Sequence, residues 1–200
     1  MKRTEIITIF DTSGSMETIR ADAEGGYNAF IEEQKKLPGE ARLTSVTFSN
    51  SVVSSPTVDV REAPRFTLRS HGGTALYDAI GQTVMTQSER ITREKWADST
   101  ILVIVTDGGE NDSRMYTREG VKTMLQMVQA LDWRVVFLAA NQDAFAVSAG
   151  MGISQQFTHN FKADSIGTRS MTGTLSDYVS NARGVGSLAD VAKAAEKLMG

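Results

Sequence analysis

The sequence predicts an α/β fold built on an open, mainly parallel sheet with helices on both faces. One observation is that three segments are short, β-branched and almost entirely apolar: "IITIF" at 6–10, "TILVIV" at 100–105 and "RVVFLAA" at 134–140. Such segments are typical of strands that are buried on both faces. The second observation is that helical patterns alternate with these strands, and this order favours parallel pairing through crossover connections.

Three further strands complete the expected sheet. "RLTSVTF" at 42–48 mixes apolar and polar residues, which indicates a more lateral strand, and "SVV" at 51–53 is expected to pair back on it after a turn. "QQFTHNF" at 155–161 is a weaker sixth strand. The helices are indicated by mostly apolar residues at helical spacing. These residues are Ile19, Ala23, Tyr27, Phe30 and Ile31, then Leu76, Ala79, Ile80, Thr83 and Val84, then Val121, Met124, Leu125, Val128 and Leu131.

Composition indicates one globular domain and excludes several functional classes. The chain has 200 residues, of which 40% are apolar and 22% are charged, and this is enough to bury a sizeable core. A net charge of −3 with scattered Lys and Arg argues against nucleic acid as a partner. The sequence contains no cysteine, which excludes disulfides, zinc-thiolate sites and cysteine nucleophiles.

Neither a signal peptide nor a membrane span is expected. The opening "MKRTEIITIF" has a short apolar run that Thr8 interrupts and Asp11 closes, and no later segment approaches the roughly 20 apolar residues of a span. We therefore expect a cytoplasmic protein with no membrane partner. Residues 1–161 are expected to form the α/β domain, and the Ser-, Thr- and Gly-rich residues 162–200 a partly helical extension packed on it. The alternative is that this extension is itself a partner-binding surface.

The candidate ligand-binding residues lie where two apolar strands end in aspartate. "IITIFD" ends in Asp11 and "TILVIVTD" ends in Asp107. In an open α/β sheet, ligands bind beyond the carboxyl ends of the strands, so these two carboxylates are expected to face each other across a crevice. Ser13 and Ser15 follow Asp11 in one turn, and the glycine pair in "SHGGTALYDAI" places Thr74 in a loop that is directed toward the same point.

A simpler explanation competes with this interpretation. Asp11, Ser13 or Ser15 could each cap a helix that begins near Glu17. Capping explains neither Thr74 nor Asp107, so it does not account for the whole set. Glu110, Asn111 and Asp112 are expected to form a solvated loop before a helix that Thr117 can cap.

The set "DTSGS", Thr74 after Gly72-Gly73, and the aspartate of "TDGGEN" resembles the metal-ion-dependent adhesion site of the von Willebrand factor type A family. The similarity covers roughly residues 4 to 160. It implies a Rossmann-like, mainly parallel six-stranded sheet of order 3-2-1-4-5-6 with one antiparallel edge strand. By the same resemblance, Ser13, Ser15 and Thr74 bind a divalent cation, while Asp11 and Asp107 act mainly through water and hydrogen bonds. The chain looks like a small standalone intracellular member of bacterial or phage type.

Hard oxygen ligands, several of them neutral, suit Mg²⁺ or Mn²⁺, with Ca²⁺ a weaker fit. Such a site stays electrophilic, and a glutamate or aspartate of a partner protein would complete it. The expected function is thus a metal-dependent protein-binding module rather than an enzyme; the oligomeric state is left open. The alternative is a Mg²⁺-dependent phosphohydrolase that uses Asp11, but its pattern requires a second aspartate where this chain has Ser13. Neither a phosphate-binding GxxxxGK[ST] loop nor a Ser-His-Asp arrangement is evident in the sequence.

Overall fold

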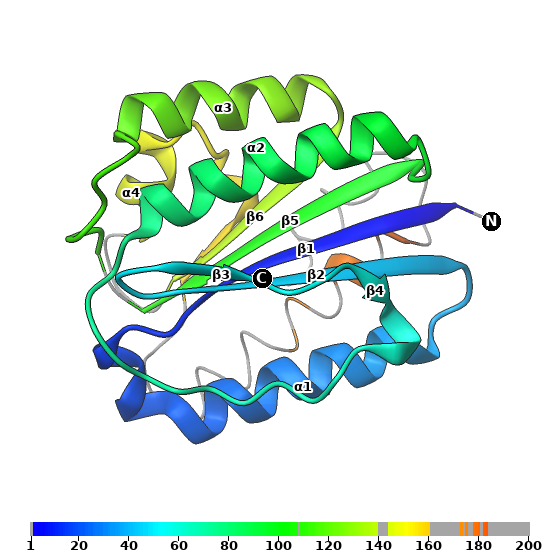
Figure 1. Ribbon diagram of the computed structural model, residues 1–200, viewed down its shortest axis with the longest axis horizontal. Helices are drawn as coiled ribbons and strands as arrows, with labels where there is room; N and C mark the ends of the chain where they lie inside the picture. Colours follow the sequence, from blue (N-terminus) through cyan, green and yellow to red (C-terminus); the bar gives the residue numbers. More distant parts are fainter. Residues whose placement is uncertain are drawn as a thin grey trace.

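The computed structural model describes residues 2–107, 109–139 and 144–160, together with 173, 175, 178–180, 182 and 183. Within these residues the strands form one sheet with helices packed on both faces (Figure 1). The strands are β1 (Arg3–Asp11), β2 (Glu40–Phe48), β3 (Val52–Ser54), β4 (Val58–Asp59), β5 (Ser99–Thr106), β6 (Trp133–Ala139) and β7 (Thr158–Asn160). The α-helices are α1 (Arg20–Lys36), α2 (Leu76–Glu94), α3 (Arg118–Ala130) and α4 (Ala144–Gly150), and the 3-10 helices are η1 (Gly14–Ile19), η2 (Val60–Glu62) and η3 (Gln155–Phe157).

The sheet confirms the predicted fold class. Its order is β3-β2-β1-β5-β6-β7, with β3 and β4 both antiparallel to β2 and the other pairs parallel. In the described part of the chain the sheet has seven strands rather than the six that the sequence predicts. The additional strand, β4, has two residues and is too short to show a periodic pattern. The sixth predicted strand begins later than expected, because Gln155–Phe157 forms η3 and the described strand is Thr158–Asn160; Phe161 lies outside the described residues.

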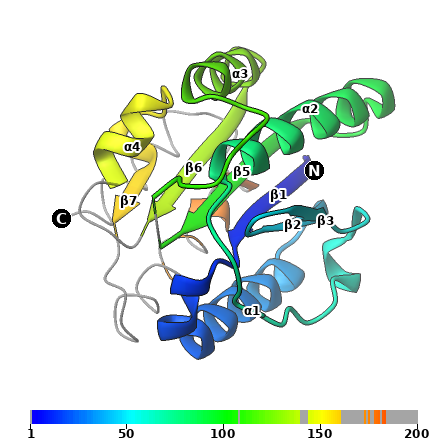
Figure 2. The same cartoon turned by 60° about the vertical axis from the view of Figure 1, so that its left-hand side comes forward.

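Alternating side chains of β1 supply two separate cores. Ile6 and Phe10 pack toward α1, whereas Ile7 and Ile9 pack toward α2 and α3, as the period of two in a strand requires. Figures 1 and 2 show α1 on one side of the sheet and α2 with α3 on the other. Almost every residue of β1 and β5 is buried, which fits strands covered on both faces.

Some residues of the predicted extension belong to the core beside α1. Leu175, Tyr178, Val179 and Ala182 are buried there, and the Arg134 guanidinium donates a hydrogen bond to the Ala182 carbonyl at 2.8 Å. Apart from these four residues and 173, 180 and 183, the predicted 162–200 extension lies outside the described residues, so the division at residue 161 stays a prediction. None of the described helices is both long and apolar enough to cross a membrane.

Parallel pairing places the predicted site at one edge of the sheet. β1 pairs in parallel with β2 and with β5, so that Phe10 lies beside Val105 and the carboxyl ends of the strands coincide. η1 follows β1 directly, and the segment that leads into α2 passes along the same edge in both views (Figures 1 and 2).

The predicted cap of α3 is confirmed, since the Thr117 hydroxyl accepts a hydrogen bond from the Gly120 N–H at 3.2 Å.

Candidate metal centre

Asp11 is the last residue of β1, and its side chain is fully buried. One carboxylate oxygen accepts a hydrogen bond from the Ser13 N–H at 2.7 Å, and the other accepts one from the Thr106 hydroxyl at 2.5 Å. The pKa of Asp11 is raised to about 6, mainly because the carboxylate is buried. The two hydrogen bonds act in the opposite direction, and the neighbouring Asp107 carboxylate adds a small increase. Both donors to the carboxylate are neutral groups.

Two serines connect Asp11 to Asp107. The Ser13 and Ser15 hydroxyls lie 3.1 Å apart, and the Ser15 hydroxyl donates a hydrogen bond to Asp107 at 2.8 Å. Ser13 is buried, Asp107 is half-buried, and Ser15 is exposed, so the cluster opens to solvent on one side. Burial also raises the pKa of Asp107, while its hydrogen bond from Ser15 lowers it. The capping alternative is wrong for Ser13, which precedes η1 but makes no side-chain capping bond to it.

Backbone hydrogen bonds join the loop that carries Thr74 to this turn. The Gly14 N–H donates to the Gly72 carbonyl at 3.0 Å, and the His71 N–H donates to the Thr12 carbonyl at 2.8 Å. Thr74 is buried at the start of α2, three residues beyond His71. These bonds bring the loop of Thr74 to the turn of Asp11, Ser13 and Ser15; the part that the Thr74 hydroxyl plays in binding a cation stays a prediction.

Gly72 and Asn50 fix the shape of this loop. Gly72 has φ +72°, in the left-handed region, and a Cβ atom at this position would overlap the Asn50 side chain. The Asn50 amide accepts a hydrogen bond from the Gly73 N–H at 3.1 Å and donates one to Asp112 at 2.6 Å. Gly72 is therefore required by close approach as well as by backbone conformation.

The predicted solvated loop at 110–112 is more ordered than expected. The Asn111 side chain accepts a hydrogen bond from the Thr74 N–H at 2.8 Å, and the Asn111 N–H donates to the Thr74 carbonyl at 3.1 Å. The half-buried Glu110 carboxylate accepts hydrogen bonds from the backbone N–H groups of Tyr77, Asp112 and Ser113 and from the Ser113 hydroxyl. The contacts of Asn111 with Thr74 and of Glu110 with Tyr77 have no local signal in the sequence, because each pair is more than thirty residues apart along the chain.

The donor set fits a hard divalent cation. Within the described ranges, neither Asp11 nor Asp107 takes part in an ion pair with a basic side chain. The same part of the chain holds no group of three or more His, Cys, Asp or Glu placed to bind a metal ion. Any cation at this edge would therefore depend on hydroxyls and two carboxylates, a donor set that suits Mg²⁺ or Mn²⁺ better than Zn²⁺ or Cu²⁺.

Comparison with known proteins identifies the fold. No protein-family model matches the sequence. No curated protein matches it either. Among solved structures, the chain is similar to the pilus adhesin SpaC from Lactobacillus rhamnosus GG (TM-score 0.69, 13% identity, covering 91% of this chain and 31% of that one). It is also similar to a von Willebrand factor type A structure from Catenulispora acidiphila (TM-score 0.59, 14% identity, covering 90% of this chain and 43% of that one).

A third similar structure is proximal thread matrix protein 1 from the mussel byssus, with a zinc-occupied MIDAS motif. Its TM-score is 0.66 at 12% identity, and the match covers 90% of this chain and 46% of that one. The chain thus spans about a third of the adhesin and less than half of the other two proteins. At these identities the likeness shows the fold alone: the chain adopts the α/β fold of von Willebrand factor type A domains.

Proposed function

We propose that this chain is a metal-dependent protein-binding module whose cation site consists of Asp11, Ser13, Ser15, Thr74 and Asp107. The Ser13 and Ser15 hydroxyls bind the cation, and the Thr74 hydroxyl binds it directly or through water. Asp11 and Asp107 balance its charge and orient the serines through hydrogen bonds. When bound, the cation supplies a Lewis-acidic centre at the solvent-facing side of the cluster, where an Asp or Glu of a partner protein completes the site.

One observation carries this proposal: a fully buried carboxylate and a half-buried one share a hydroxyl-rich cluster that contains no basic partner in the described residues. Burying an unpaired carboxylate is unfavourable, so such a group needs a compensating cation. A divalent cation would supply that charge. The exposed Ser15 hydroxyl leaves the cluster accessible from solvent, as docking of a partner carboxylate requires.

The similar structures support a metal-dependent interaction module in general. The mussel protein holds zinc in its MIDAS motif, and SpaC is an adhesin. We propose Mg²⁺ or Mn²⁺ rather than zinc for this chain, because the cluster offers oxygen ligands without His or Cys. We also propose that the chain acts inside the cell as a standalone member of the family.

A binding role also suits Asp11 better than a role as the nucleophile of a phosphohydrolase. Both of its carboxylate oxygens accept hydrogen bonds, and the side chain has no exposed surface. The position two residues further on, where an acid/base aspartate would be required, is Ser13, whose hydroxyl faces that of Ser15.

Calorimetric titration of Mg²⁺, Mn²⁺ and Ca²⁺ into EDTA-treated protein tests the cation site. We expect saturable binding of Mg²⁺ and Mn²⁺ that Asp11→Ala and Ser13→Ala each weaken by about tenfold or more. The matched control is Asp132→Asn: Asp132 is exposed, lies just before β6 at the other end of the sheet, and has φ 64°, which asparagine tolerates. Wild-type protein that binds neither cation, or variants that bind as well as Asp132→Asn, would contradict the proposal.

The partner carboxylate needs a second experiment. Binding of an acidic peptide selected from a random library would be measured in Mg²⁺ and in EDTA, for wild type and Asp11→Ala. We expect binding only by wild type in Mg²⁺, and loss of binding when the acidic residue of the peptide is changed to its amide. Equal binding in EDTA would show that the cation does not bridge the two proteins.

A further inference from the structure

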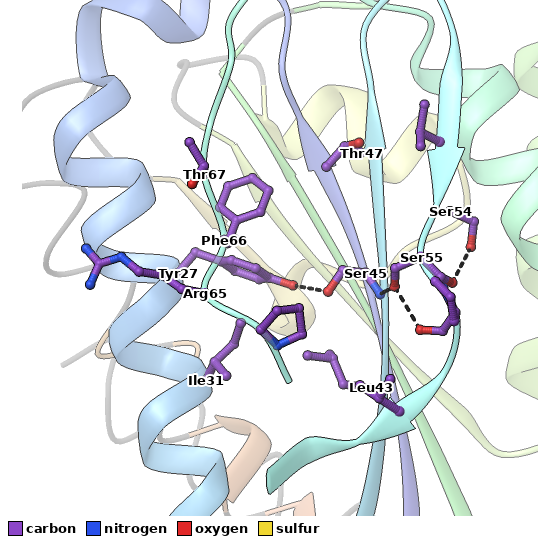
Figure 3. Close-up of a pocket in the computed structure, with 14 residues that line it drawn as sticks. Tyr27, Ile31, Leu43, Ser45, Thr47, Ser54, Ser55, Arg65, Phe66 and Thr67 are labelled. Carbon is purple, nitrogen blue, oxygen red and sulfur yellow. Dashed lines mark hydrogen bonds between the residues drawn. The ribbon is translucent and has the colours of Figure 1, made fainter. Parts of the chain in front are cut away.

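A cavity of about 290 Å³ lies on the α1 side of the sheet, beside the edge formed by β3 and β4 (Figure 3). Buried Tyr27 and Ile31 of α1 and Leu43 of β2 form its floor, and the exposed segments around Ser55 and Arg65 form its mouth. It belongs to none of the loops that carry the proposed cation ligands. Its volume is close to the lower limit of roughly 300–1,000 Å³ that is typical of small-molecule sites.

The side chains of β2 explain why the space exists. On the face toward α2, β2 carries the large buried residues Val46 and Phe48. On the face toward α1 the corresponding half of the strand carries Ser45 and Thr47, which are only half-buried. Small side chains at positions that face a helix leave a volume that large apolar residues would otherwise fill. The cavity is therefore specified by the sequence of this strand.

Hydrogen bonds fix the outer wall in place. The Asn28 side-chain amide donates to the Phe66 carbonyl at 2.9 Å and accepts from the Phe66 N–H at 2.8 Å. The Glu24 carboxylate accepts a hydrogen bond from the Leu68 N–H at 3.0 Å. The Phe66 ring packs edge-on against Tyr27, with ring centroids 4.9 Å apart. The wall is preformed, as is usual for ligand sites, rather than a loose loop over a gap.

The interior combines apolar walls with a small group of hydroxyls. The Tyr27 hydroxyl lies 2.9 Å from the Ser45 hydroxyl and 2.5 Å from that of Thr8, deep in the floor. Thr47 lines the same space. Among the described residues of the lining, Arg65 is the one charged side chain, and Figure 3 shows its guanidinium pointing away from the rings of Tyr27 and Phe66. The described lining thus presents rings and hydroxyls to the interior of the cavity, and its one charge points away from the rings.

We propose that this cavity is a binding site for a neutral aromatic small molecule that carries one hydrogen-bonding group. The rings of Tyr27 and Phe66 favour an aromatic ligand, because tilted ring pairs gain more than their buried area alone provides. The Tyr27 and Ser45 hydroxyls bind its polar group. An anionic ligand would lose its hydration without a buried cation to replace it, so the site discriminates against charge.

Titrations with three naphthalene derivatives, followed by amide chemical shifts in nitrogen-15 NMR spectra, test this proposal. The probes carry a hydroxyl, a methyl or a sulfonate group at the same ring position. We expect saturable shifts centred on residues 27, 45–47 and 66 for the hydroxyl and methyl compounds, with the sulfonate binding at least about tenfold more weakly. Shifts centred instead on 11–15 and 72–74, or tightest binding of the sulfonate, would overturn the proposal.

Two variants localise the site further. Thr47→Phe fills the cavity and should weaken binding of naphthol and methylnaphthalene alike by about tenfold or more, whereas Thr123→Phe, the same change on the exposed face of α3, should not. Tyr27→Phe should weaken binding of naphthol by about three- to tenfold more than binding of methylnaphthalene. Unchanged affinity in Thr47→Phe would overturn the assignment, and if that variant does not fold, the shift map of wild type and the Tyr27→Phe comparison decide the question.

Discussion

β1 carries a buried carboxylate near each of its two ends, and the two carboxylates differ in the charge of the groups that surround them. Near the amino end, Glu5 is 1% exposed, and both of its oxygens accept hydrogen bonds from the Arg90 guanidinium, at 2.8 and 3.1 Å. Arg42 lies 4.0 Å from the same carboxylate. At the carboxyl end, Asp11 is 0% exposed, and in the described part of the chain it accepts hydrogen bonds from neutral donors, the Ser13 N–H and the Thr106 hydroxyl.

This difference separates a structural carboxylate from one whose compensating charge must come from elsewhere. The bidentate pair with Arg90 neutralises Glu5 within the chain. Asp11 has no such partner in the described residues, and burial accordingly raises its pKa to about 6. The comparison supports a cation site at the carboxyl end of the sheet. The following three predictions test whether Glu5 and Asp11 differ in this way.

The largest expected effect is that of Arg90→Ala. Within the described residues, removal of this guanidinium leaves Glu5 buried with the more distant Arg42 as its basic neighbour, and breaking a buried pair in this way costs about 3–5 kcal/mol of unfolding free energy. Urea denaturation of the variant and wild type would measure the loss. Arg90→Lys retains the charge and should recover part of it.

The matched test is a double-mutant cycle of Glu5→Gln and Arg90→Gln. We expect the two changes together to cost much less than the sum of the single changes, because the double variant leaves no unpaired buried charge. Strict additivity would show that Glu5 and Arg90 do not stabilise each other, and the contrast with Asp11 would then lose its basis.

The second prediction concerns Asp11→Asn. In EDTA the unfolding free energy should stay within about 1 kcal/mol of wild type or rise, because asparagine removes an uncompensated buried charge while it keeps one acceptor oxygen. Wild type should gain about 2.7 kcal/mol at a Mg²⁺ concentration one hundred times the dissociation constant, and the variant much less. Thermal unfolding in EDTA and in Mg²⁺ would measure both quantities.

The opposite result would be informative as well. If Asp11→Asn destabilised the metal-free protein as much as Arg90→Ala does, Asp11 would be a structural carboxylate like Glu5. Asp132→Asn serves as the control for a general effect of removing one negative charge, because Asp132 is exposed.

Local pattern was sufficient for most of the fold and for the edge of the sheet at which Asp11, Ser13, Ser15 and Asp107 lie together. Apolar runs predicted β1, β5 and β6. Asp11 ends β1 and Asp107 follows β5, and the two had to meet because parallel strands place their carboxyl ends at one edge. Two-residue β4 was missed because a period cannot be read from so short a segment.

Long-range polar contacts were beyond the reach of such reasoning. Glu5 and Arg90 are 85 residues apart, and Asn50 contacts Gly73 and Asp112 across 23 and 62 residues. The cavity beside Tyr27 likewise depends on how Ser45 and Thr47 face α1, which no single segment reveals. The sequence therefore indicated the elements that carry these side chains, but it could not indicate which side chains pair with one another.

The smallest expected effect is that of Arg42→Met, which separates the outer part of the Glu5 cluster from its centre. The Arg42 guanidinium lies 2.9 Å from Glu94 and 4.1 Å from the centre of the Trp96 ring, and its side chain is 35% exposed. Solvent screens such a pair, so its loss should cost about 1 kcal/mol in low salt and less in high salt, while Arg90 continues to neutralise Glu5. Urea denaturation at two salt concentrations measures this difference. If Arg42→Met cost as much as Arg90→Ala and the cost did not depend on salt, Glu5 would need two cationic partners. The contrast between Glu5 and Asp11, whose charge is uncompensated at the other end of the strand, would then be still stronger.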